Sequence, residues 1–118
     1  MSEASPPDEL FENLRIELRS GCLILAVLGQ LRTEHYGYTL RKALADMGLE
    51  IDENTLYPML RRLEKQGLLE SEWREENNRK KRFYWLSVLG QRILADLYTE
   101  WDGIERALKR VRQEGHKR

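Results

Sequence analysis

The chain reads NTLYPMLRRLEKQGLL from Asn54 to Leu69, a pattern that predicts a helix from about Asn54 to Gln66 with Gly67 as its end. At about 100° per residue, the apolar residues of this helix gather on one side: Leu56, Met59, Leu60 and Leu63. The opposite side and its flanks carry Asn54, Tyr57, Pro58, Arg61, Arg62 and Lys65. A helix that reads a major groove needs such a division. One face packs on the core, and the other offers amide, guanidinium and ammonium groups to the DNA.

This helix also has a simpler interpretation, because a charged helix face is often only solvated. Pro58 is compatible with the helix, since we expect it in the first turn, where amide groups have no helical partner.

A second pattern follows Gly67. The runs Leu68 to Arg74 and Lys81 to Leu86 flank the polar stretch Glu75-Glu76-Asn77-Asn78, which predicts an antiparallel hairpin with a charged tip. Four basic residues, Arg79-Lys80-Lys81-Arg82, would then lie across a minor groove or bind phosphates beside the helix. A charge run alone usually indicates a solvated loop, but this one follows a helix with the features of a DNA reader.

Further helices are predicted on both sides. Upstream, leucines at every fourth position predict a helix over 8–19, Ser20-Gly21 would end it, and another helix would run from Cys22 to about Leu31. After a turn at 35–38, Thr39 would cap a helix that stops at Gly48. Ser87 would open a long last helix with an apolar stripe: Leu89, Ile93, Leu97, Trp101, Ile104, Leu108 and Val111.

These elements predict a mainly α protein with a small β-hairpin, that is, a winged helix-turn-helix with an N-terminal helix and a long C-terminal dimerisation helix. We expect a flexible arm at 1–7, the N-terminal helix at 8–20, the winged helix-turn-helix at 21–86, the C-terminal helix at 87–114 and a basic tail at 115–118.

The last stripe is too long for a small winged-helix core to cover, and heptad-like spacing most often packs against another helix. The sequence therefore predicts a homodimer. Its expected interface contains Leu10, Leu14, Leu18, Ile93, Leu97, Trp101, Ile104, Leu108 and Val111.

Length and composition limit the class of protein. With 118 residues, the chain has room for one domain. Its 20 basic and 20 acidic residues cancel, which mildly disfavours nucleic-acid binding, but the bases are concentrated in the hairpin and the C-terminal stretch. The longest apolar run, Cys22 to Leu28, is far shorter than the roughly 20 residues that span a bilayer. The acidic start is unlike a secretory signal, so we expect a cytoplasmic protein in which Cys22 is a reduced core residue.

The sequence disfavours an enzyme. The two histidines, His35 and His116, lie far apart, and no Cys/His cluster has metal-ligand spacing. A glycine-rich phosphate loop is absent, and Ser20 and Ser71 have no obvious base. We therefore expect no catalytic residue, no metal and no cofactor.

The segment Asn54 to Leu69 resembles the third-helix signature of PadR-type transcriptional regulators, most specifically in Thr55-Leu56-Tyr57-Pro58. The similarity continues through Glu72-Trp73, the basic hairpin and Phe83-Tyr84-Trp85-Leu86-Ser87 with Gly90, and Tyr36-Gly37-Tyr38 resembles the start of the family's second helix. It covers roughly residues 20–112. Two departures are Trp85, where a basic or polar residue is common, and Asn54, where glycine or another small residue is frequent.

The resemblance implies a dimer, usually a repressor, that binds a palindromic operator and often releases it when a ligand or stress signal arrives. It implies that Thr55, Tyr57, Arg61, Arg62 and the wing bases face DNA. With the outer helix face, the candidate DNA-binding residues are Asn54, Thr55, Tyr57, Pro58, Arg61, Arg62, Lys65, Arg79, Lys80, Lys81 and Arg82.

The single C-terminal helix resembles the compact subgroup of the family, which includes multidrug-binding repressors. There, a tryptophan at the matching place lines a pore at the dimer centre and stacks on flat drugs. The resemblance implies that Trp101, with Tyr98 and Ile104 nearby, binds a planar aromatic or cationic ligand. A tryptophan in a helical stripe is more often plain interface core, so both alternatives remain open.

Two other functions stay open. A winged-helix adaptor without a DNA role would bring the basic wing to an acidic protein partner, and a ligand-binding dimer would have DNA binding as a secondary role. Salt separates DNA reading from the adaptor, because phosphate contacts weaken steeply and log-linearly with salt.

Overall fold

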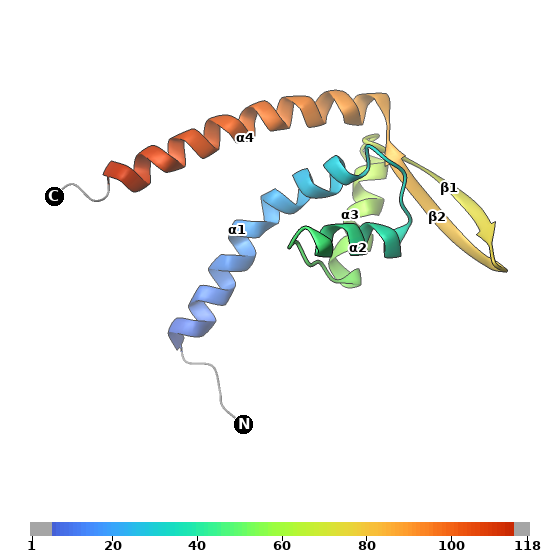
Figure 1. The fold of residues 1–118 in the computed structure, drawn as a ribbon, viewed down its shortest axis with the longest axis horizontal. Helices are drawn as coiled ribbons and strands as arrows, with labels where there is room; N and C mark the ends of the chain where they lie inside the picture. The colour runs from blue at the N-terminus through green and yellow to red at the C-terminus, as the bar shows by residue number, and fades with distance from the viewer. Residues whose placement is uncertain (1–5, 115–118) are drawn as a thin grey trace.

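The computed structural model describes residues 6–114, which form four helices and one two-stranded sheet (Figure 1). Helix α1 spans Pro6–Gln30, α2 spans Gly37–Asp46 and α3 spans Glu53–Lys65. Strands β1 (Leu69–Glu76) and β2 (Arg79–Leu86) form the wing, and α4 runs over Val88–Glu114. The predicted class, mainly α with a winged helix-turn-helix and a β-hairpin, is confirmed. The predicted tail at 115–118 lies outside the described residues.

One apolar core holds the winged helix-turn-helix together. Its buried members come from every element: Val27, Leu28, Leu31, Leu40, Leu44, Ile51, Leu56, Leu60, Leu63, Leu69, Tyr84, Leu86 and Leu94. Only the C-terminal end of α1 and the first turns of α4 contribute to it. Leu56, Leu60 and Leu63 are at most 2% exposed, so the predicted inner face of α3 is confirmed.

The break predicted at Ser20-Gly21 is wrong, since α1 continues through both residues. A glycine inside a helix costs only about 1 kcal/mol relative to alanine, and the leucine-rich flanks offset that cost. The helix also begins earlier than expected. Pro6 and Pro7 open α1, because proline fits the first helical turn, and the rest of the predicted arm, 1–5, lies outside the described residues.

The ends of α2 and α3 agree with prediction, and α3 starts one residue before the predicted Asn54, whereas α2 starts earlier than predicted. Gly48 and Gly67 follow the helices with φ of +87° and +83°, the left-handed conformation that glycine adopts most easily. Tyr36, not Thr39, is the N-cap of α2. Asp52 caps α3 by accepting a 2.8 Å hydrogen bond from the Thr55 amide. Since α3 therefore starts at Glu53, Pro58 lies in the second turn and not, as predicted, in the first.

The wing is a regular antiparallel hairpin, and its register runs from Leu69 opposite Leu86 to Glu76 opposite Arg79. Only Asn77 and Asn78 form the turn, with φ of 52° and 63°, as a two-residue type I′ turn requires. The predicted charged tip is therefore wrong. The tip is two neutral amides, and the four bases lie along β2, where successive side chains point to opposite faces.

Helices α1 and α4 extend well beyond this domain. Their ends diverge on the side away from the wing (Figure 1), and the radius of gyration, 17.7 Å, exceeds the roughly 13 Å of a compact domain this long. Ser87 caps α4 as predicted, because its Oγ accepts a 2.9 Å hydrogen bond from the Gly90 amide. Cys22, predicted to lie in the core, is only half-buried on α1.

Candidate nucleic-acid interface

The outer face of α3 is free for contact. Asn54, Thr55 and Pro58 are exposed, as are the basic residues Arg61, Arg62 and Lys65. Within residues 6–114, no ion pair engages any of these three bases. Their charges are therefore available to an anionic partner without first breaking an internal bond.

Tyr57 lies partly inward. Its ring packs on the first turn of α2 so closely that a Cβ on Gly37 would lie 2.4 Å from the ring carbon Cε1. The side chain is half-buried against the core, so Tyr57 positions α3 on α2 and leaves only part of the ring accessible.

The four basic residues of the wing, Arg79 to Arg82, differ in how they are held. Arg79 and Lys80 are exposed, and no ion pair among the described residues involves them. Lys81 is half-buried, with its Nζ 4.5 Å from the centre of the Tyr36 ring and 3.7 Å from Glu76. Arg82 turns back to α3, where it donates a 2.6 Å hydrogen bond to Glu64. The guanidinium of Arg82 is therefore already paired within the chain, and the contact of the four basic residues with DNA stays a prediction.

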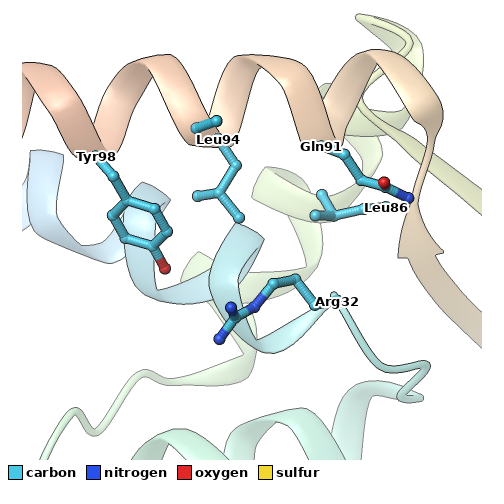
Figure 2. Close-up of a pocket in the computed structure, with 6 residues that line it drawn as sticks. Arg32, Leu86, Gln91, Leu94 and Tyr98 are labelled. Carbon is cyan, nitrogen blue, oxygen red and sulfur yellow. The ribbon is translucent and has the colours of Figure 1, made fainter.

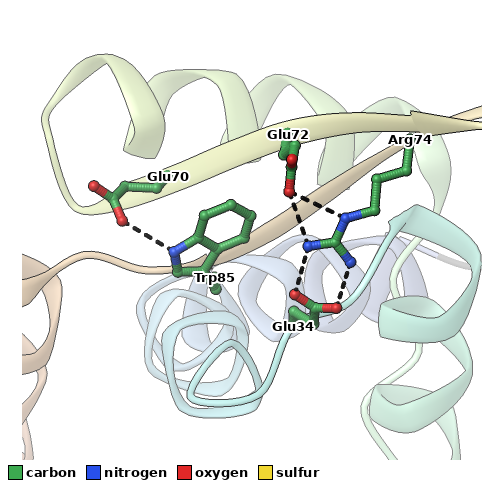
Figure 3. Close-up of polar contacts among 5 residues, drawn as sticks. All are labelled: Glu34, Glu70, Glu72, Arg74 and Trp85. Atoms are coloured by element: carbon green, nitrogen blue, oxygen red, sulfur yellow. Dashed lines mark hydrogen bonds and ion pairs between the residues drawn. The ribbon is translucent and has the colours of Figure 1, made fainter.

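Arg74, in the half of β1 nearer the turn, joins the wing to the segment between α1 and α2 (Figure 3). It donates hydrogen bonds of 2.5 and 3.0 Å to the two carboxylate oxygens of Glu34, and two more to Glu72. The bond from Arg74 holds the pKa of Glu34 below its ordinary value, and the two carboxylates raise the pKa of Arg74. Sequence reasoning missed this group, since no local pattern relates residues that lie 40 positions apart.

Two further contacts stiffen the wing. His35 and Tyr84 exchange backbone hydrogen bonds of 3.1 and 2.8 Å, which adds a bridge beside β2. Burial lowers the pKa of His35, which favours the neutral form of its ring. On the opposite side, Trp85 is half-buried and its Nε1 donates a 3.0 Å hydrogen bond to Glu70 (Figure 3).

Away from the wing, α1 and α4 expose apolar side chains. Six residues of the predicted dimer interface are largely exposed in the single chain: Leu10 (61%), Leu14 (54%), Leu18 (72%), Ile104 (42%), Leu108 (54%) and Val111 (67%). Ile93, Leu97 and Trp101 are half-buried. An apolar hollow of about 450 Å³ lies between the two helices, and its lining includes Leu18, Cys22, Leu25, Leu97, Trp101 and Ile104.

The predicted ligand residues do not meet in one place. Trp101 and Ile104 line the α1–α4 hollow, whereas Tyr98 lines a different hollow of about 410 Å³ with Arg32, Leu94 and Gln91 (Figure 2). The Tyr98 hydroxyl lies over α1, where a Cβ on Gly29 would be 2.6 Å away. Tyr98 and Trp101 are three residues apart on one helix but meet different stretches of α1, Tyr98 at Gly29 and Trp101 in the hollow lined by Leu18, Cys22 and Leu25.

Within residues 6–114, no helix is long and apolar enough to cross a membrane. The same residues contain no cluster of three or more His, Cys, Asp or Glu side chains arranged to hold a metal ion.

Comparisons with known proteins agree with this geometry. The sequence profile of the PadR-like family of transcriptional regulators matches residues 24–96. The fold is similar to the crystal structure of a PadR family transcriptional regulator from Eggerthella lenta DSM 2243, with a TM-score of 0.85 and 40% identity, over 92% of this chain and 96% of that one. It also resembles a PadR-like transcription factor from Bacteroides fragilis, with a TM-score of 0.71 and 27% identity, over 84% of this chain and 98% of that one.

A curated relative, the transcriptional regulator Rv3488 of Mycobacterium tuberculosis, is 38% identical over 63 residues. The alignment covers 53% of this chain and 59% of that protein.

Proposed function

This chain belongs to the PadR-like family of transcriptional regulators, and from this premise we propose that it binds a palindromic operator as a cytoplasmic homodimer and represses transcription. The observation that carries the proposal is the outer face of α3. Arg61, Arg62 and Lys65 are exposed there and make no ion pair in the described part of the chain, while Leu56, Leu60 and Leu63 anchor the other face in the core.

In this proposal α3 enters a major groove. The planar guanidinium groups of Arg61 and Arg62 suit two acceptors on a guanine edge, and Lys65 suits a phosphate. Arg79 and Lys80, exposed near the tip of the wing, reach the neighbouring minor groove or its phosphates. Arg82 has no part in the contact, because Glu64 already neutralises it.

The exposed apolar stripes of α1 and α4 support the dimer. A monomer would leave Leu10, Leu14, Leu18, Leu108 and Val111 in water, and pairing with a second copy would bury them. A two-fold axis through this pairing places the two recognition helices about 34 Å apart, roughly one turn of DNA.

Selection of bound sequences from a random DNA pool at about 150 mM salt tests the proposal, with an Arg61→Ala/Arg62→Ala variant in parallel. We expect a palindromic consensus with half-sites about one turn apart, and its loss in the variant. A folded, dimeric sample that enriches no sequence would overturn the proposal.

The adaptor alternative predicts a different response to salt. For a protein that reads DNA, the logarithm of the binding constant falls linearly with the logarithm of the salt concentration. The slope of this line becomes steeper by about 0.9 for each phosphate contact. A winged helix that binds only an acidic protein partner would retain no DNA affinity above the non-specific level.

A response to a ligand is a second candidate function, favoured by the lining of the α1–α4 hollow around Trp101. We propose that a planar aromatic or cationic molecule stacks on this indole. Quenching of tryptophan emission by planar dyes tests it. Loss of quenching in Trp101→Ala, with Trp73 and Trp85 in place, supports the proposal, and unchanged quenching contradicts it.

A further inference from the structure

A polar cleft separates the start of α2 from the wing. Its volume is about 580 Å³, and its lining consists of Tyr36, Tyr38, Asn77, Arg79 and Lys81. Neither tyrosine belongs to the set of DNA-facing residues that the sequence predicts. Tyr38 is 60% exposed even though its ring stacks on that of Tyr36, with 6.4 Å between their centres.

The side chains in this cleft are held in place before any ligand arrives. The Tyr36 ring packs edge-on against Phe83 at 5.3 Å, and the Lys81 ammonium lies 4.5 Å from the centre of the Tyr36 ring. A lysine held in this way loses less conformational entropy when it binds an anion than a fully mobile lysine does. The nearest carboxylate, Glu76, is half-exposed and 3.7 Å from Lys81, a distance at which the pair is weak and exchangeable.

The Tyr36 hydroxyl is set to donate. Lys81 donates a 3.4 Å hydrogen bond to that oxygen, so the Tyr36 O–H proton remains free for another acceptor. Arg79, which makes no ion pair within residues 6–114, supplies a second positive charge. One hydroxyl donor, one ammonium and one guanidinium line the same cleft, a set that matches a singly charged, oxygen-rich anion.

The cleft adjoins the recognition helix. Gly37, the residue after Tyr36, lies directly against Tyr57 of α3, so the start of α2, which lines one side of the cleft, packs on α3 while the wing lines the other side. When α3 occupies a major groove and the wing reaches the next minor groove, the phosphate backbone that separates these grooves passes between them.

We infer that this cleft binds one phosphate of the DNA backbone in each half-site, with Tyr36, Lys81 and Arg79 as its ligands. The inference rests on the proposed function and extends it, since it assigns the start of α2 to the interface and gives Tyr36 a direct contact. This phosphate fixes how the duplex lies relative to α3 and carries no base sequence itself.

The test uses the operator obtained by selection, in a series of duplexes in which each phosphate in turn is replaced by a neutral methylphosphonate. Binding is measured for the wild type, Tyr36→Phe, Lys81→Gln and, as a matched lysine control, Lys109→Gln on α4. For the wild type, we expect one phosphate per half-site, between the α3 and wing contacts, whose neutralisation weakens binding roughly tenfold, as loss of hydrogen bonds to a charged group predicts.

When that phosphate is neutralised, the affinity of Tyr36→Phe and of Lys81→Gln for the operator should fall less than about twofold, because each substitution has already impaired the contact. The affinity of Lys109→Gln should fall as much as that of the wild type. Lys81→Gln should also reduce the salt slope by about 0.9 per protomer, and Tyr36→Phe should leave it unchanged. If Tyr36→Phe and Lys81→Gln still bind the operator, and neutralising each phosphate lowers their affinity as much as it lowers that of the wild type, the cleft inference is overturned and the proposed function stands. If the wild type selects no operator, the proposed function fails first.

Discussion

The guanidinium of Arg82 on β2 donates a 2.6 Å hydrogen bond to Glu64 on α3, although the two residues are 18 positions apart. Ser71 of β1 completes the group, since its hydroxyl donates to the other Glu64 oxygen and accepts a 2.9 Å bond from Arg82. The wing is thereby joined to the helix that presents Arg61 and Arg62. The same contact pairs one positive charge of the proposed DNA-binding surface, so Glu64 both joins the wing to α3 and serves as an internal counterion.

Glu64→Gln should therefore reduce specificity more than stability. It releases Arg82, so non-specific affinity should rise and the salt slope should steepen by about 0.9 per protomer. The loss of stability should be below about 1 kcal/mol, because the pair is partly solvated. The measurement is the ratio of operator affinity to random-DNA affinity across a salt series, with Glu64→Gln/Arg82→Gln expected to restore the wild-type slope. An unchanged slope in the single variant contradicts the counterion role.

Glu34 should make stability depend on pH. Its pKa is lowered chiefly by the hydrogen bond from Arg74, so the folded state favours the ionised form. The resulting stability is present above the ordinary pKa of 4.5 and is lost as the pH falls through the lower, folded-state pKa. We expect Glu34→Gln to lower Tm at pH 7 and the difference from the wild type to close in acid. Burial also lowers the pKa of His35, which destabilises both proteins alike in acid, so the difference isolates Glu34. A Tm difference that is constant with pH would contradict the prediction.

Gly90 should tolerate no side chain. A Cβ at this position would lie 2.1 Å from the carbonyl oxygen of Leu68, so the first turn of α4 would have to leave the wing. Gly90→Ala should lower the free energy of unfolding by about 3 kcal/mol. In the same helix, Gly103 has no heavy atom near its Cβ position, and Gly103→Ala should raise the free energy of unfolding by about 1 kcal/mol. Urea denaturation at one fixed protein concentration compares them, and equal stability of Gly90→Ala and the wild type would refute the close approach.

Leu108→Glu should dissociate the proposed dimer. Leu108 is 54% exposed in the single chain, and a carboxylate there would be buried without a partner in the paired stripes. We expect dimerisation to weaken at least about 100-fold, measured by sedimentation equilibrium. Val88, 85% exposed on α4 but outside the stripe, is the matched control, and Val88→Glu should remain dimeric. If Leu108→Glu and the wild type dimerise equally well, the interface lies elsewhere.

Local periodicity was sufficient to predict much of this fold. The spacing of Leu56, Leu60 and Leu63 predicts which face of α3 is buried, because a helix repeats every 3.6 residues whatever surrounds it. Gly48 and Gly67 mark helix ends for an equally local reason, since only glycine adopts a positive φ at little cost. The wing strands follow from the aromatic-rich runs on either side of Asn77-Asn78.

Helix starts and side-chain directions required the folded chain. Tyr36 rather than Thr39 is the N-cap of α2, and α1 continues through Gly21, because these alternatives differ by only about 1 kcal/mol and packing selects between them. Tyr98 and Trp101 share a helix, yet they line separate hollows, because Tyr98 lies with Arg32 and Leu94 whereas Trp101 lies over the Leu18 to Leu25 stretch of α1.

Which wing bases are free to meet DNA was likewise settled by tertiary contacts. Arg79 and Arg82 belong to one run of four bases, and nothing in that run distinguishes them. Glu64 and Ser71, brought beside Arg82 by the packing of the wing on α3, neutralise one arginine and leave the other exposed. Such pairings join residues that are distant in sequence, and their energy exists only once the core has fixed the distance between the two charges.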